Sequence, residues 1–350
     1  MKIIILATGW LGDTLMLTPT IKVLRERFPF AQIVALTAFQ SSYYVLKNNP
    51  YLNKIYYYPF LKKGYLKSIS YLLSSLYRKY DVSLTFYPSY RKHYHVIAFL
   101  VNAKKRIAVK FNKGYIRECF FLYTDLVEAE EDKHHVINNF KLLKPLGIDI
   151  TEKETLKFDL EFYPDPISAK GQNILNSLKT PYIFLHNGSS TFKKGSDKKR
   201  LNFSQLEMLI TKLVIKDYQV VFNVGPEEKI QGKYLQEKMG NLIANKQLIL
   251  LSDISLSDLT HIIKKSYKVI STDSGIHHLA SALKKEIIII EGPTDERKTY
   301  PWNTKYHLVT APVKCRPCYL SYTQKAFECK NGNRWECMEK IDVDEIVELA

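Results

Sequence analysis

One strand-like run of the chain ends in Thr272-Asp273-Ser274-Gly275 and passes at once into an amphipathic helical pattern. The free N–H groups and the positive end of such a helix form an anion site, and Gly275 leaves room for a phosphate to approach. His278, which lies off the apolar stripe of the helix, adds a polar side chain. The segment therefore predicts a diphosphate-binding turn. The alternative is an ordinary helix with Asp273 as its N-cap and a surface histidine.

A second strand–glycine–helix junction, ATGWLGDTLMLTP, occupies residues 7–19. Asp13 stands at its mouth directly after Gly12. A carboxylate there can act as a general base, or it can simply cap the helix. Capping is the commoner role of an aspartate at this position, so spacing alone leaves both roles open.

Two further strand ends carry polar side chains. The segment HNGSSTFKKGSDKKR, residues 186–200, combines the hydroxyls of Ser189, Ser190 and Thr191 with a basic cluster that includes Lys199. Hydroxyls and lysines at a strand end suit phosphate binding, and a flexible charged loop is the alternative. The next such strand ends in Val224-Gly225-Pro226-Glu227-Glu228, where an acidic residue can hold a ribose or a base edge.

Four of the five cysteines lie near the C-terminus, at Cys315, Cys318, Cys329 and Cys337. Four thiols in a tail with little regular pattern resemble a tetrahedral structural site for zinc or, second, iron. Free thiols are the next interpretation, and disulfides come last because the chain is expected to be cytosolic. The remaining Cys119 is expected in the core.

The positive charge of the chain is concentrated in residues 61–120. The net charge is +16, and this stretch holds thirteen Lys and Arg residues against Asp81 and Glu118, with eight interleaved tyrosines. A basic, aromatic surface can bind nucleic acid, an anionic membrane face or a phosphorylated ligand. A merely solvated lysine-rich face carries equal weight. Arg91 and Lys92 are the candidate contacts of this stretch with an anionic ligand.

The elements that must position these residues form two series of alternating strands and helices, which is typical of a parallel α/β sheet. The first series comprises strands at residues 2–7, 32–38, 54–57 and 82–86 and helices at 14–27, 41–47, 66–78, 93–101 and 134–146, with Pro19 expected to kink the first helix. The second comprises strands at 182–186, 219–224, 247–250, 269–272 and 287–291 and helices at 203–216, 227–239, 256–265 and 275–284. Residues 150–179 are the predicted linker.

Length and composition fit this organisation. The chain has 350 residues, enough for two domains of the usual ~100–200 residues each. No apolar run approaches the ~20 residues of a membrane-spanning helix, and the apolar N-terminal run is too short for a secretory signal. We therefore expect a cytoplasmic protein.

Taken together, these segments resemble glycosyltransferase family 9, the heptosyltransferase family. The resemblance extends in order over nearly the whole chain and rests on Leu11-Gly12-Asp13, Arg106 in KKRIAV, Gly225-Pro226-Glu227-Glu228, STDSGIHHLASAL, Glu291-Gly292-Pro293-Thr294 and the tail CRPC…C…CM. It implies the α/β GT-B fold, in which two Rossmann-like domains face each other across a cleft. Residues 1–165 would then bind the acceptor. Residues 166–350, with the Cys-rich tail 315–337, would bind the nucleotide-sugar.

The resemblance also implies an inverting transfer that needs no metal cofactor, with heptose moving from ADP-heptose to an anionic glycolipid, a lipopolysaccharide core or a related glycan. Peripheral contact with the inner face of the membrane would accompany it, and nucleic acid would not be a partner. Asp13 looks like the catalytic base, Lys199 like the lysine that neutralises the donor phosphates, and Arg106 like an acceptor contact. A structural ion pair is the other interpretation of Arg106. The residues that look like donor contacts are Ser190, Glu228, Asp273, Ser274, Gly275 and His278.

The sequence departs from the family at three places. Leu201 stands where the family usually has Trp, the loop over residues 189–199 is longer than usual, and Trp10 is bulky beside Asp13. These departures leave the donor sugar open, as the sequence leaves the acceptor and the oligomeric state. Two rival classes also remain, namely a basic nucleic-acid-binding protein and a nucleotide-sugar epimerase of the same two-lobed fold.

Overall fold

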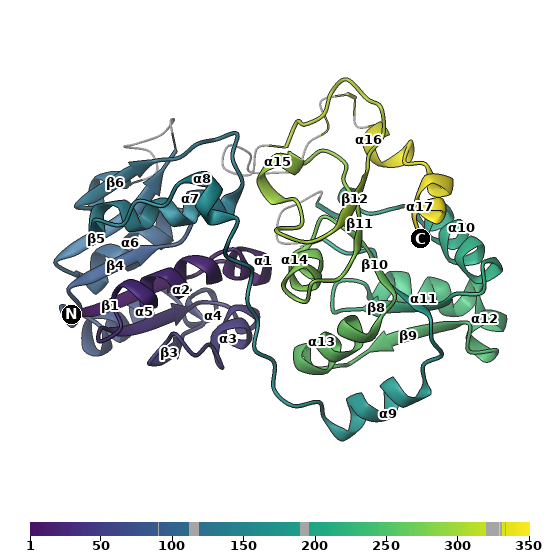
Figure 1. Ribbon diagram of the computed structural model, residues 1–350, viewed down its shortest axis with the longest axis horizontal. Coiled ribbons are helices and arrows are strands. Elements are labelled where there is room, and N and C mark those ends of the chain that lie inside the picture. The colour runs from purple at the N-terminus through teal and green to yellow at the C-terminus, as the bar shows by residue number, and fades with distance from the viewer. Residues whose placement is uncertain (90, 112–118, 190–195, 320–328, 330, 333) are drawn as a thin grey trace. The chain divides into compact units, whose positions relative to one another are not determined.

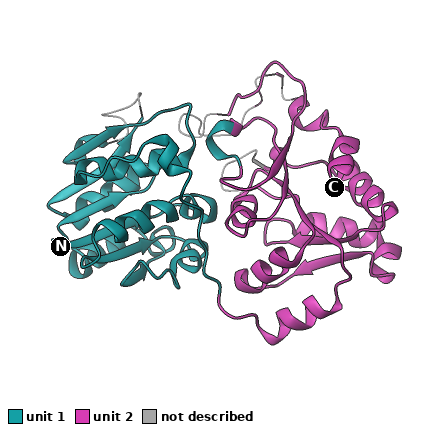
Figure 2. Cartoon of the chain, viewed as in Figure 1, with its two compact units in different colours: residues 1–164, 297–300 teal, residues 165–296, 301–350 magenta. Residues whose placement is uncertain are grey.

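A computed structural model of the chain describes residues 1–89, 91–111, 119–189, 196–319, 329, 331–332 and 334–350. The chain divides into two compact units, coloured separately in Figure 2. The N-terminal unit comprises residues 1–164 and 297–300, and the C-terminal unit comprises residues 165–296 and 301–350.

The N-terminal unit is built on a sheet of six parallel strands in the order β3-β2-β1-β4-β5-β6 (Figure 1). The strands are β1 (Lys2–Ala7), β2 (Gln32–Thr37), β3 (Lys54–Tyr57), β4 (Val82–Thr85), β5 (Lys105–Lys110) and β6 (Asp125–Glu128). The helices are α1 (Leu11–Leu15), α2 (Thr18–Arg27), α3 (Gln40–Leu46), α4 (Phe60–Lys63), α5 (Tyr65–Ser75), α6 (Lys92–Val101), α7 (His135–Phe140) and α8 (Glu152–Thr155). The central strand β1 reads as a continuous apolar run, as expected where both faces of a sheet are covered.

The C-terminal unit repeats the plan with the strand order β12-β11-β10-β7-β8-β9. Its strands are β7 (Tyr182–His186), β8 (Gln219–Val224), β9 (Leu248–Ser252), β10 (Lys268–Thr272), β11 (Ile287–Ile290) and β12 (Tyr306–Val309). Its helices are α9 (Ala169–Ser177), α10 (Phe203–Ile215), α11 (Lys229–Lys238), α12 (Gly240–Ala244), α13 (Leu256–Lys265), α14 (Gly275–Ala282), α15 (Glu296–Thr299, shared with the other unit), α16 (Glu336–Glu339) and α17 (Val343–Leu349). The C-terminal helix α17 packs on α10 through Ile346 and Val347.

Both sheets have the doubly wound order. All strands are parallel, and the order in which strands are added to the sheet switches from one side to the other beside the first strand of the unit. The predicted fold class of two Rossmann-like α/β sheets is therefore confirmed. In such sheets ligands bind outside the carboxyl ends of the strands, at the point of this switch. This point lies between β1 and β4 in one unit and between β7 and β10 in the other.

Two predicted helices differ from the structure because of proline. The helix expected over residues 14–27 is two helices, and Pro19 lies in the first turn of α2, where a missing N–H breaks no helical hydrogen bond. The helix expected over residues 134–146 is α7 followed by a tighter 3₁₀ turn, Lys141–Leu146, which holds Pro145. Among the described residues, no helix combines the length and the apolar character that crossing a bilayer requires.

Candidate active site

The turn between β10 and α14 is the centre of the polar site in the C-terminal unit. Ser274 is the N-cap of α14: its Oγ accepts a hydrogen bond from the N–H of Ile276 (3.3 Å), and its own N–H donates to Nδ1 of His277 (3.2 Å). The interpretation of Asp273 as the N-cap is therefore wrong. Because Ser274 caps the helix, the carboxylate of Asp273 is left to serve other partners.

Asp273 forms an ion pair with Lys199, and its Oδ2 also accepts a hydrogen bond from Oγ1 of Thr294 (2.9 Å). Lys199 ends the 3₁₀ turn Ser196–Lys199 of the loop after β7, and Thr294 follows β11. Burial pushes the pKa of Asp273 up, but the charge of Lys199 and the hydrogen bonds outweigh it and hold that pKa below its usual value. The sheet thus brings a lysine to the start of α14, as predicted.

Glu228 lies at the end of β8 and is almost fully buried against Arg200, whose Nη2 donates to its Oε1 (3.0 Å). Burial raises the pKa of Glu228 to about 7, although the charge of Arg200 opposes the rise. Two glycines make room for this carboxylate. A Cβ on Gly225 would lie 2.5 Å from Oε2 of Glu228, and one on Gly188 would lie 2.7 Å from Oε1.

Arg200 was not singled out from the sequence, although it closes the basic cluster that contains Lys199. Besides Glu228 it holds two backbone carbonyls, those of Ser189 (2.9 Å) and Glu227 (3.0 Å). It therefore ties the end of the loop after β7 to the end of β8. Ser190, predicted as a donor contact, lies outside the described residues.

The histidines of this site are buried, so the interpretation of a surface histidine at the start of α14 is wrong. His277 and His278 are both buried, and their ring centroids lie 3.8 Å apart. Burial, with smaller contributions from the charges of Arg200 and His277, lowers the pKa of His186 to about 3, so that His186 is neutral near pH 7. Its Nδ1 lies 3.0 Å from Nδ2 of Asn223.

Glu291 received no role of its own from the sequence, although its carboxyl group is fully buried. Neither carboxyl oxygen has a hydrogen-bond partner among the described residues. Thr272 pairs with Ile290 across the sheet, so Glu291 follows β11 at the level where Asp273 follows β10. Burial first, and then the charge of Asp273, raise the pKa of Glu291 well above its usual value. The site therefore sets a carboxyl group whose pKa is lowered beside one whose pKa is raised.

Asp13 is the third residue of α1, directly beyond the carboxyl end of β1, and it is partly exposed. Its Oδ2 accepts a hydrogen bond from the N–H of Trp10, the N-cap residue of α1 (3.1 Å), so Asp13 caps the helix from its first turn, as the third residue of a capping box does. A Cβ on Gly9 would lie 2.7 Å from Cβ of Asp13, so the turn needs glycine there. The ring of Trp10 stacks on Phe39 with centroids 3.9 Å apart. Asp13 therefore caps α1 and also lies where the strand order of the sheet switches sides, which is where ligands bind in such folds.

Of the three predicted acceptor contacts, the structure places two at the carboxyl ends of the strands, where Asp13 also lies. Arg91 is the N-cap residue of α6, which follows β4, and the exposed Lys92 is its first residue. Arg106 instead pairs with Ser83 near the amino-terminal ends of β4 and β5, on the opposite side of the sheet from the carboxyl ends where Asp13 lies. Its guanidinium donates to the carbonyls of Leu122 (2.9 Å) and Ala103 (3.0 Å). The structure therefore gives Arg106 a structural role, with carbonyl oxygens rather than a carboxylate as its main partners.

The basic stretch is less aromatic at its surface than the sequence implied. Tyr80, Tyr87 and Tyr94 are buried in the core of the N-terminal unit, so their prediction as surface residues was wrong. Tyr65 is highly exposed.

Two of the four C-terminal cysteines, Cys318 and Cys337, lie beside the turn that follows β11. The N–H of Cys318 donates to the carbonyl of Pro293 (3.0 Å), and a Cβ on Gly292 would lie 3.5 Å from Sγ of Cys337. Burial, and then the thiolates of Cys318, Cys315 and Cys329, raise the pKa of Cys337 to about 11. All five cysteines are unbridged. Even so, no three His, Cys, Asp or Glu side chains within the described ranges are arranged as a metal-binding group.

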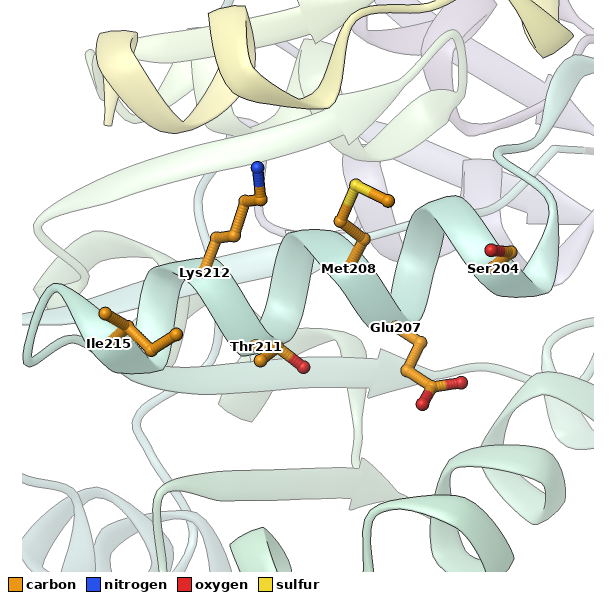
Figure 3. Close-up of a pocket in the computed structure, with 6 residues that line it drawn as sticks. All are labelled: Ser204, Glu207, Met208, Thr211, Lys212 and Ile215. Carbon is orange, nitrogen blue, oxygen red and sulfur yellow. The ribbon is translucent and has the colours of Figure 1, made fainter.

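A hollow elsewhere on the C-terminal unit runs along the outer face of α10 (Figure 3). It is lined by Ser204, Glu207, Met208, Thr211, Lys212 and Ile215. Lys212 is paired with Asp344, and none of the predicted site residues lines this hollow. It is therefore not a candidate for the site of transfer.

Comparison with known proteins agrees with this geometry. The family model described as glycosyltransferase family 9 (heptosyltransferase) matches residues 76–328. The chain is similar to lipooligosaccharide heptosyltransferase 2 of Campylobacter jejuni, with 27% identity over 100% of this chain and 97% of that protein. It is also similar to lipopolysaccharide heptosyltransferase 3 of Escherichia coli, with 24% identity over 83% of this chain and 84% of that protein. Among solved structures, E. coli ADP-heptose lps heptosyltransferase II matches with a TM-score of 0.72 and 18% identity, over 99% of this chain and 97% of that one, which confirms the predicted GT-B fold.

Proposed function

Because the chain belongs to glycosyltransferase family 9, the heptosyltransferase family, and is a glycosyltransferase, we propose that it transfers heptose from ADP-heptose to an anionic glycolipid in lipopolysaccharide biosynthesis. The donor is supported by the E. coli structure described as an ADP-heptose heptosyltransferase. The acceptor class is supported by relatives described as lipooligosaccharide and lipopolysaccharide heptosyltransferases. The observation that carries the proposal is the ion pair of Lys199 with Asp273 beside the start of α14.

We place the donor diphosphate at this helix start, where the N–H groups that follow Ser274 and Gly275 face it. Lys199 then exchanges the carboxylate of Asp273 for the phosphate, and its charge stabilises the leaving group as negative charge develops there. His278 adds a polar side chain close to the diphosphate. Glu228 accepts hydrogen bonds from the ribose or the base. Because lysine and the helix terminus supply the positive charge, we propose that transfer is independent of metal.

We assign the general base to Asp13. In a single displacement the acceptor oxygen bonds to the anomeric carbon as the bond from that carbon to the diphosphate breaks. Asp13 takes the proton of the acceptor hydroxyl, and the nucleoside diphosphate leaves. Attack opposite the leaving group inverts the anomeric configuration. Arg91 and Lys92, at the same sheet edge, bind the anionic groups of the acceptor.

We further propose that the four C-terminal cysteines hold a structural zinc ion, with iron as the second choice. Four thiols fit the donor set of such an ion, and the pKa of Cys337 is raised by burial and by the charges of the other three thiolates, which a bound cation would offset. This ion would order the tail and take no part in transfer.

The decisive experiment follows ADP-heptose with and without a heptose-deficient lipopolysaccharide core, using mass spectrometry of both products. We expect ADP release and a heptosylated core only when both substrates are present. Conversion of the donor sugar without any acceptor would instead identify an epimerase. A panel of nucleotide-sugars, read by thermal stabilisation, tests the donor separately, and stabilisation by a UDP-sugar but not by ADP-heptose would refute the proposed donor.

A further inference from the structure

The N-terminal unit exposes an apolar helical face that no other described element covers. Tyr65 and Leu66, in the first turn of α5, are 87% and 85% exposed, and Leu61 on the preceding α4 is 54% exposed. Further along α5, Ile69 and Leu73 are also exposed, four and eight residues after Tyr65. Because residues four apart share a face of a helix, these side chains form one stripe.

A separate stripe of α5 already serves the core. Leu72 is 1% exposed, and Ser68 is buried beside it, where its hydroxyl donates to the carbonyl of Gly64 (2.6 Å). The helix is therefore apolar on its buried side and again on its outer side. An ordinary surface helix is polar on its outer side, and exposed apolar patches usually mark a binding surface.

Positive charge borders this outer face. Lys62 and Lys63 end α4, Lys67 lies in the first turn of α5, and all three are exposed. Residues 59–80 contain five Lys and Arg residues and no Asp or Glu. Apolar and aromatic side chains bordered by lysines are typical of helices that lie in the interface of an anionic bilayer.

The position of this face in the sheet gives it a consequence for catalysis. The helices α4 and α5 follow β3, so the first turn of α5 lies on the side of the sheet where the strands have their carboxyl ends. Asp13 follows β1 and Arg91 follows β4 on that same side. The neighbouring helix α6 packs against α5 and exposes Val96 and Phe99.

We propose that the face formed by Leu61, Tyr65, Leu66, Ile69 and Leu73, with Lys62, Lys63 and Lys67 at its border, docks onto an anionic phospholipid bilayer. The apolar side chains enter the interfacial layer, and the lysines contact the phosphate headgroups. A second copy of the chain is a poor occupant, because a symmetric contact would bring the same lysines together. The proposal of docking depends only on the composition and exposure of this surface. Only its consequence, delivery of a lipid-linked acceptor to the sheet edge of Asp13, rests on the proposed function.

The test is flotation of the full chain with vesicles of phosphatidylethanolamine and phosphatidylglycerol, against vesicles of phosphatidylcholine alone. We expect binding to the anionic vesicles that weakens as salt rises, because surface charges are screened over ~10 Å at 0.1 M salt. The double variant Tyr65→Glu/Leu66→Glu should lose at least ~10-fold in vesicle affinity, since it puts two charges into the interface. Replacing Lys62, Lys63 and Lys67 by Gln should remove the preference for anionic vesicles.

The matched control is Ile215→Glu, because Ile215 on α10 is 75% exposed and lies in the C-terminal unit. It should bind vesicles like the unmodified chain. All variants should keep the melting temperature and the rise in it that ADP produces, so a failure of docking is separable from a failure of the proposed donor. Equal vesicle binding by the Tyr65→Glu/Leu66→Glu variant, or no binding by the unmodified chain, would overturn the proposal. A dimer in sedimentation that only this variant loses would also overturn it, in favour of a second copy.

Discussion

At the scale of single residues, Asp13 combines two roles that one substitution separates. Its Oδ2 caps α1 at the N–H of Trp10, and Asn keeps that acceptor while losing basicity. We expect Asp13→Asn to retain its melting temperature and its ADP binding, and to lose ~10²–10⁴-fold in kcat. Asp13→Ala should lose the cap as well, at ~1 kcal/mol of stability. Steady-state kinetics and thermal melts check both, and an Asp13→Asn variant that kept most of its kcat would leave Asp13 only a cap.

Lys199 is expected to act on both donor affinity and rate, because its charge is worth most when the diphosphate departs. Removing it alone also leaves the largely buried carboxylate of Asp273 without its charged partner, which destabilises the protein. We therefore compare Lys199→Met/Asp273→Asn, in which no buried charge is left unpaired, with the single variant Lys198→Ala. Lys198 is exposed and pairs loosely with Asp197, at 3.8 Å.

The Lys199→Met/Asp273→Asn variant should fold, bind ADP at least ~10-fold more weakly and lose kcat, while Lys198→Ala should change neither. Calorimetry with ADP and single-turnover transfer give the two numbers. Equal, small losses in both variants would favour a merely solvated loop.

Glu291 predicts a pH dependence of stability. Its folded pKa is raised by burial and by Asp273, and the other charges acting on it are those of Lys199, Glu296 and Arg316. The folded state therefore holds a proton that the unfolded state releases above pH ~4.5. This contribution to stability is complete below that pH and is lost as the pH rises towards the folded pKa.

Glu291→Gln fixes the neutral form and should flatten the fall in melting temperature between pH 5 and pH 8. Melts of both proteins across this range test the idea, with Glu237→Gln, an exposed glutamate on α11, as the control. Parallel curves for the unmodified chain and Glu291→Gln would show that Glu291 titrates normally.

At the scale of elements, the cysteine-bearing tail is fastened to the turn after β11, where Thr294 meets Asp273. Nε of Arg316 donates to the carbonyl of Gly292 (2.7 Å), and the N–H of Tyr319 donates to that of Pro293 (2.9 Å). A metal at the four cysteines would therefore order a segment beside the donor turn without reaching the diphosphate. We expect elemental analysis to find about one zinc or iron per chain.

Removing that metal with a chelator should lower the melting temperature and expose four more titratable thiols. As long as the enzyme stays folded, its rate of transfer should be the same with and without the metal. Cys119→Ser, outside the cluster, should leave the metal content unchanged. Four free thiols in protein that never contained zinc or iron would contradict the metal site.

The elements that could be predicted from the sequence are those with strong local patterns. The strands Lys2–Ala7 and Tyr182–His186 and the helix Leu256–Lys265 lie at their predicted bounds, because each is a strongly apolar or amphipathic run between polar turns. The strands β5, β6 and β12 were missed. Both β5 and β6 begin and end in charged residues, which leaves only two or three apolar residues in each. The helix α9 was missed inside the predicted linker, where its buried contact with Asp258 is made by Gly171 rather than by a large apolar side chain.

The same distinction applies to the site. Motifs at strand ends located Asp13, Lys199, Glu228 and Ser274, because a local turn fixes where each one stands. Pairings over long separations could not be predicted: Lys199 with Asp273, Glu291 beside Asp273, and Arg106 with the carbonyl of Leu122 depend on sheet order. Arg106 is the clearest example of this limit, since its local sequence does not say whether it lies near the amino-terminal or the carboxyl ends of the strands.

At the scale of the whole molecule, the net charge of +16 should govern encounters with an anionic acceptor. The positions of its charges nonetheless decide binding. Arg91 and Lys92 stand at the carboxyl edge of the N-terminal sheet with Asp13, whereas Lys79 and Lys104 precede β4 and β5 at the opposite edge. Two double variants that change the net charge equally, Arg91→Ala/Lys92→Ala and Lys79→Ala/Lys104→Ala, therefore separate local contact from the general field.

We expect Arg91→Ala/Lys92→Ala to raise the acceptor KM by ~10-fold at low salt, with ADP affinity and melting temperature unchanged. The effect should shrink above ~0.3 M salt, where the screening length falls to several ångströms and weakens even short-range steering. Lys79→Ala/Lys104→Ala should raise the acceptor KM by less than ~2-fold, because it alters only the distant field. Transfer kinetics across a salt series measure all three proteins. If both double variants raised KM equally, the acceptor would be drawn by overall charge, and Arg91 and Lys92 would not be contacts.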